Sequence, residues 1–161
     1  MAKNISAVST LLIVIFGMVA QQVQAASGQT EQGATLYQRC SACHMTSGVG
    51  VAGMFPPLID RIGPLAQSPL GREYLILVVD KGMRGQIQVG KDQYTGFMPA
   101  QGPGLGDEGI ATVLNYILTT FNASHLPETW SAFKASEVSQ VRDKYAGEGN
   151  NELHQLREKV F

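Results

Sequence analysis

The amino-acid sequence predicts a mainly α-helical domain, with three core helices, long loops, a short hairpin and a helical C-terminal extension. Three segments repeat apolar residues at the three- and four-residue spacing of amphipathic helices. Of the 18 glycines, 13 lie at positions 48–109, and six of the seven prolines lie at positions 56–103. Because this composition is typical of loops, the domain needs a further buried partner, and a large flat apolar cofactor would supply one.

The three core helices are each marked by local signals. The first covers about residues 30–39. The second follows Ser68, a favourable N-cap, has Pro69 at its first position and ends at Gly82. The third opens near Asp107, which complements the helix dipole. The apolar face of the first helix consists of Ala34, Leu36, Tyr37 and Cys40, and that of the second of Leu70, Tyr74, Leu77 and Val78. The apolar face of the third helix consists of Ile110, Val113, Leu114, Ile117 and Leu118.

Two further regions complete the predicted fold. Ile87 and Val89 alternate with glutamines before Gly90-Lys91-Asp92, which indicates a short hairpin. After residue 125 the pattern changes, and Ser136 is positioned to cap a further helix. A last amphipathic segment, which we expect to pack on the domain rather than to hold a partner, carries Leu153, Leu156 and Val160.

The composition excludes several classes of protein. Twelve Lys and Arg against 13 Asp and Glu give a formal net charge of −1. Because these charges form no long runs, the chain shows no electrostatic footprint for nucleic acid. With 44% hydrophobic residues it is not intrinsically disordered as a whole, and two cysteines cannot form a disulfide-dense scaffold.

The N-terminus resembles an export signal. Lys3 precedes a largely apolar stretch, and Val23-Gln24-Ala25 matches a signal-peptidase site. The alternative is an uncleaved membrane anchor, but this stretch is shorter than the ~20 residues that span a bilayer. We therefore expect residues 1–25 to be a signal peptide, 26–125 the main domain and 126–161 the extension, with the mature protein in the periplasm.

The most specific feature is Cys40-Ser41-Ala42-Cys43-His44, the C-x-x-C-H pattern of covalent haem attachment. Two thiols three positions apart at a helix end can each add to one vinyl group of a porphyrin. The adjacent imidazole then lies beneath the iron. The sequence therefore predicts one covalently attached haem c, held by Cys40 and Cys43, with His44 as an iron ligand.

Three other interpretations use the same residues. A thioredoxin-like dithiol belongs to a βαβ context, which is missing from the pattern here. A structural disulfide is compatible with an oxidising compartment. A zinc site would have to recruit His125 or His154, because there is no second cysteine pair.

The order of motifs resembles that of small single-haem cytochromes c with His and Met axial ligands. The resemblance is carried by positions 40–44, by Pro56-Pro57-Leu58 and by Tyr94-Thr95-Gly96-Phe97-Met98-Pro99, ahead of a helix with Asn115-Tyr116-Ile117. It covers about residues 31–121 and implies a cytochrome c-like fold, in which helices and long loops surround the haem.

The same resemblance assigns roles to several residues. It implies that the carbonyl of Pro56 accepts a hydrogen bond from the ligand histidine, and that Gly33 and Tyr116 lie where the first and third helices cross. The segment from Gly33 to the first cysteine is one residue shorter than is usual in the family. This leaves the aromatic contact of the first helix open between Leu36 and Tyr37.

The second iron ligand has four methionine candidates outside the predicted signal. Met45 and Met54 are tethered to the side of His44 and cannot easily reach the opposite face. Met98, placed before Pro99 in a glycine-rich loop, is favoured by this position and by the family resemblance. Met83, a remaining histidine or an open site are the alternatives.

His/Met ligation raises the reduction potential of a haem and suits electron transfer. We therefore expect a periplasmic one-electron carrier, or the haem subunit of a dehydrogenase or reductase complex, and not an enzyme in its own right. Its partners would be redox proteins, such as a dehydrogenase, reductase or oxidase. Small-molecule substrates are not expected. Contact with a membrane is expected only if the signal peptide stays uncleaved. The alternative is a haem enzyme or gas sensor with an open or displaceable sixth ligand.

Overall fold

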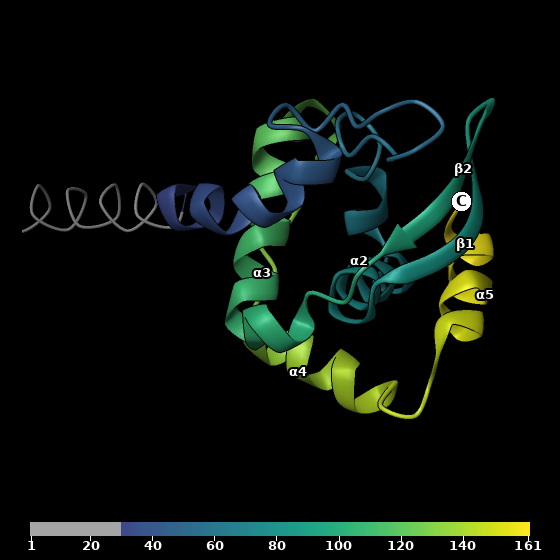
Figure 1. The fold of residues 1–161 in the computed structure, drawn as a ribbon. Coiled ribbons are helices and arrows are strands. Elements are labelled where there is room, and N and C mark those ends of the chain that lie inside the picture. The colour runs from purple at the N-terminus through teal and green to yellow at the C-terminus, as the bar shows by residue number, and fades with distance from the viewer. Residues whose placement is uncertain (1–29) are drawn as a thin grey trace, which may run out of the picture. The chain divides into compact units, whose positions relative to one another are not determined.

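A computed structural model describes residues 30–161 of the chain, of which residues 33–161 form one compact unit (Figure 1). The predicted signal peptide, residues 1–25, lies outside the described residues. Within the described part, no helix is both long and apolar enough to cross a membrane. The mainly helical fold predicted from the sequence is confirmed.

The first helix is longer than predicted and includes the whole attachment motif. Residues 30–44 are helical, so that both cysteines and His44 lie on its last turns. The helix stops because Met45 adopts a left-handed conformation, with φ of 64°. The hydroxyl of Tyr37 donates to the Met45 carbonyl over 2.8 Å and fixes this end.

The first helix packs closely on α3 (Gly102–Phe121), as the family resemblance implied. A Cβ on Gly33 would lie only 2.6 Å from the Cβ of Tyr116, so that only glycine allows this approach. Tyr37, buried and 5.5 Å from Tyr116 between ring centroids, makes the aromatic contact that the sequence left open. Leu36 is only partly buried beside the core.

We expect Gly33→Ala to lower the free energy of unfolding by about 1–3 kcal/mol, because the methyl group overpacks the crossing of the two helices. Urea unfolding followed by circular dichroism measures the change. The control is Gly147→Ala, where a Cβ would meet nothing within 4 Å. Equal stability of the two variants would contradict a tight crossing at Gly33.

Helix α2 (Pro69–Lys81) matches the prediction at both ends. The Ser68 side chain accepts a hydrogen bond from the Gly71 N–H over 3.0 Å, and Gly82 follows the last turn. A short 3-10 helix, η1 (Pro64–Gln67), precedes it. The side chains buried between α2 and α3 form the centre of the core, which includes Leu75, Ile76, Val113, Leu114 and Ile117.

Helix α3 starts earlier than the acidic residues suggested. Its first turn begins at Gly102, but Gly106 leaves the helical conformation, with φ of 63°, so that the continuous helix follows this kink. The predicted start near Asp107 therefore describes the longer segment, which carries the apolar stripe into the core.

The hairpin consists of β1 (Met83–Val89) and β2 (Asp92–Met98). The strands pair antiparallel from Val89 opposite Asp92 to Met83 opposite Met98. Met98 is thus the last residue of β2, whereas the sequence placed it in a loop. The strand reaches Met98 because its backbone pairing with β1 continues as far as Met83.

The C-terminal segment adds η2 (Ala123–His125), α4 (Ala135–Lys144) and α5 (Asn150–Val160). The N-cap of α4 is Lys134, not Ser136, which lies inside the helix. Helix α5 lies beside the hairpin (Figure 1). Its apolar residues Leu153 and Leu156 are buried in the core, as expected.

Helix α5 also binds the outer edge of β1 through side chains. The Asn150 amide accepts from the Arg84 N–H over 2.9 Å and donates to the Arg84 carbonyl over 3.1 Å. The His154 Nε2 donates to the same carbonyl over 2.8 Å. Because these side chains satisfy the backbone of a strand edge, they hold the hairpin in place against α5.

Candidate haem site

His44 lies at the end of the first helix with its ring held in one orientation. Its Nδ1 is 2.8 Å from the carbonyl oxygen of Pro56. A carbonyl can only accept, so Nδ1 carries the proton and the lone pair of Nε2 is free to bind a metal. Burial lowers the pKa of His44, an effect that the hydrogen bond to Pro56 partly offsets. The ring is therefore neutral, as a ligand must be.

The loop after the motif brings Pro56 to this position. The Gly50 N–H donates to the His44 carbonyl over 3.0 Å, which turns the chain back on the helix end. Gly50 has φ of 65°, and a Cβ there would lie 2.2 Å from the Phe55 carbonyl oxygen. Only glycine fits this turn, so Gly50 sets the path that aims the Pro56 carbonyl at the imidazole.

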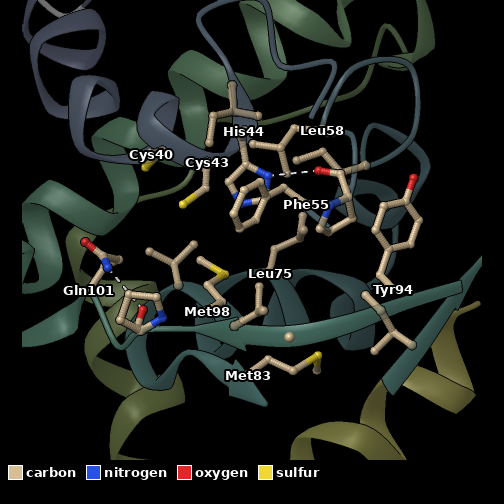
Figure 2. Close-up of a pocket in the computed structure, with 18 of the residues that line it drawn as sticks. Cys40, Cys43, His44, Phe55, Leu58, Leu75, Met83, Tyr94, Met98 and Gln101 are labelled. Atoms are coloured by element: carbon tan, nitrogen blue, oxygen red, sulfur yellow. Dashed lines mark hydrogen bonds between the residues drawn. The ribbon is translucent and has the colours of Figure 1, made fainter. Parts of the chain in front are cut away.

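Cys40 and Cys43 are free and half-buried, one helical turn apart on the wall of the same pocket (Figure 2). Burial raises the pKa of Cys40 to about 11. This is the opposite of the lowered pKa that a dithiol oxidoreductase requires. Within residues 30–161 no group of three His, Cys, Asp or Glu side chains could hold a metal, which disfavours the zinc interpretation.

Met98 lies across the pocket from His44 (Figure 2). Met83 also lines the pocket, but in this view it lies below the strand ribbon, whereas the Met98 side chain lies on the His44 side of it. Both methionines come from the paired ends of the hairpin. The hairpin that α5 holds therefore positions a thioether opposite the imidazole.

The pocket between these groups is large and apolar. Its empty space is about 1300 Å³, a volume that includes the open mouth. A flat apolar macrocycle with one imidazole and one thioether at its faces fits this donor set and this lining. Apolar residues from the loop, α2, the hairpin and α3 form the walls, among them Phe55, Leu58, Leu75, Val78, Val79, Ile87, Val113, Leu114 and Ile117.

The other histidines lie outside the pocket. His125 is half-exposed, with its Nδ1 3.5 Å from a carboxylate oxygen of Asp60, and His154 binds the backbone of β1. No sequence pattern pointed to Arg61, which lines the pocket together with Tyr94. Only its position in the folded loop identifies it, because a single arginine in a loop forms no pattern.

Comparison with known proteins agrees with this geometry. The family model described as cytochrome c matches residues 30–121. Two cytochromes c-552 of Thermus thermophilus are each 40% identical over 112 residues, which covers 70% of this chain and 85% and 75% of those proteins. The fructose dehydrogenase cytochrome subunit of Gluconobacter japonicus is 32% identical over 121 residues, covering 71% of this chain and 22% of that protein.

The cofactor of this family, covalently attached haem c, corresponds to the cysteine spacing at positions 40 and 43. The match to the family extends over more than half of the chain, and the two cytochromes c-552 are covered over most of their length. The chain therefore belongs to the cytochrome c family.

Proposed function

We propose that this protein is an exported one-electron carrier, in which Cys40 and Cys43 hold haem c by thioether bonds and His44 and Met98 are its axial ligands. The observation that carries the proposal is the His44 imidazole, fixed by the Pro56 carbonyl and facing Met98 across an apolar pocket. Bound haem c supplies one-electron chemistry through its iron.

The residues around the pocket support transfer rather than catalysis. A ligand side chain on each side leaves no open position for a substrate. The bond from His44 to Pro56 limits rearrangement of the ring between redox states. The Met98 thioether favours the ferrous state and so raises the reduction potential.

The mouth of the pocket supports contact with a protein partner. Met54 and Phe97 line the pocket, yet they are 59% and 65% exposed. Apolar side chains at the rim of a redox site suit a small, transient interface, in which little surface is buried and release is fast. We propose a redox enzyme as the partner, since one relative is named as the cytochrome subunit of a dehydrogenase.

Export is proposed from the sequence at residues 1–25. The mature protein would then act in the periplasm, either free, like a soluble cytochrome, or as the subunit of an oxidoreductase complex. Fractionation of cells that express the full chain, followed by mass determination of the haem protein, tests both cleavage after Ala25 and location.

The test of the carrier function is carbon monoxide binding to the reduced holoprotein at neutral pH. We expect the visible spectrum to remain unchanged over minutes, because Met98 occupies the site that the gas would take. Rapid formation of a carbon monoxide complex by the unmodified protein would instead support a haem enzyme or gas sensor with a displaceable ligand. The spectrum of the reduced protein under nitrogen is the control.

A further inference from the structure

Side chains of α5 cover the outer edge of β1, where a further strand could otherwise pair (Figure 1). Within residues 30–161 the sheet has two strands, β1 and β2. The Asn150 side chain exchanges two hydrogen bonds with the backbone N–H and carbonyl of Arg84, as a neighbouring strand would. His154 donates to the same carbonyl, and the Arg157 Nη2 donates to the carbonyl of Gln88. Alternate residues of a strand turn their polar backbone groups to the same edge, so α5 binds this edge at two outward-facing residues.

The ladder of the hairpin connects the contact at Arg84 to Met98. Residue pairs in an antiparallel ladder alternate between those that exchange hydrogen bonds and those that do not. The polar backbone groups of Arg84 face α5, so its pair with Phe97 is of the second kind. The next pair, Met83 with Met98, is therefore of the first kind. A single step along the ladder separates the backbone that Asn150 holds from the backbone that carries the thioether.

The hairpin itself contains little that would hold Met98 in place. Each strand has seven residues, of which one is buried, Met83 in β1 and Tyr94 in β2. On the other side of Arg84, Gly85 is paired with Gly96, so this step of the ladder has no contact between side chains. A two-stranded hairpin with so few buried side chains is only marginally stable by itself. The contact with α5 therefore supports the ladder at its weakest step, close to Met98.

We propose that Asn150, supported by His154, is a positioning residue for the sixth iron ligand. By holding the backbone of Arg84, it keeps the Met98 thioether on the iron and slows the replacement of this thioether by other ligands. Helix α5 lies beyond the family match at residues 30–121, so this support comes from the C-terminal extension. The inference rests on the proposed ligation by Met98 and adds a role for the extension in keeping the iron closed.

The test measures how fast added imidazole binds to the ferric holoprotein, because imidazole reaches the iron only when the thioether has left it. Asn150→Ala removes two exposed hydrogen bonds, so we expect imidazole to bind about tenfold faster. The charge-transfer absorption band of the bond between thioether and ferric iron should weaken in the same variant. Asn151→Ala makes the same substitution at the next, exposed position of α5 and should leave the rate and the band unchanged.

A second control separates positioning of the ligand from general stability. The Asn115 side chain in α3 exchanges the same two kinds of hydrogen bond with the backbone of Phe133, and so holds another part of the C-terminal extension. Asn115→Ala should lower the free energy of unfolding at least as much as Asn150→Ala, yet leave the rate of imidazole binding unchanged. Equal rates for Asn150→Ala and Asn151→Ala, or equal acceleration in Asn115→Ala and Asn150→Ala, would overturn the proposal.

If Asn150→Ala yields no folded holoprotein, His154→Ala decides the same question. It removes one hydrogen bond to the Arg84 carbonyl, so imidazole should bind about threefold faster, and an unchanged rate would reject the proposal. Failure of this inference alone would leave the unmodified protein with its charge-transfer band and with slow imidazole binding. Failure of the proposed ligation by Met98 would instead remove both properties from the unmodified protein.

Discussion

Replacing Met98 by leucine is expected to convert the holoprotein from a closed carrier into a ligand-binding haem protein. Leucine keeps the apolar volume at the end of β2 but lacks the sulfur atom. Without the thioether, the side facing Met98 is open, and the reduced protein should bind carbon monoxide within seconds. The reduction potential should fall by about 0.1 V or more, part of the ~0.8 V range that axial ligands cover. A spectroscopic redox titration and a carbon monoxide difference spectrum measure both effects.

Met83→Leu is the matched control, because Met83 is paired with Met98 across the hairpin and lines the same pocket. We expect this variant to keep its spectrum, its potential to within a small shift, and its resistance to carbon monoxide. If Met83→Leu opens the iron and Met98→Leu does not, the ligand is Met83. A change in neither variant would mean that the sixth ligand is not a methionine of the hairpin.

Local signals explain why much of the site could be predicted from the sequence. The spacing of Cys40, Cys43 and His44 is short enough for one helix end to fix it, and the structure places all three on the last turns of the helix. The hydrogen bond from His44 to Pro56 joins residues twelve positions apart across a loop, and the family resemblance predicted it. The capping residues of α2 are also local signals, and their prediction is confirmed.

Contacts between distant segments could not be predicted from such local signals. The register that carries β2 as far as Met98 depends on pairing with Met83, which periodicity alone does not define. Arg61 and Arg157 meet only because the loop before η1 and the end of α5 converge on Phe161. Such charge clusters depend on tertiary packing, and no pattern of fixed spacing in the sequence predicts them.

Asn122 is a further residue of this kind, and it is the hydrogen-bonding centre of the loop that leads to Arg61. It follows α3 and is fully buried, with 0% exposure. Its Oδ1 accepts from three consecutive backbone N–H groups, those of Arg61, Ile62 and Gly63, over 3.0 to 3.1 Å. Its Nδ2 donates to the Leu58 carbonyl over 2.9 Å, so one amide fixes the loop from both sides.

Asn122→Ala is therefore expected to lower the free energy of unfolding of the holoprotein by roughly 4 kcal/mol, because each buried backbone group left without a partner costs ~1–3 kcal/mol. Urea unfolding followed by circular dichroism measures the loss. The control is Asn151→Ala, at an exposed position of α5, whose free energy of unfolding should stay within about 0.5 kcal/mol of that of the unmodified protein. Asn122→Asp keeps the acceptor oxygen but loses the donor to Leu58 and buries a charge, so it should also be destabilised. A loss below about 1 kcal/mol in Asn122→Ala would show that water replaces the amide and that the loop carrying Arg61 is held by other contacts.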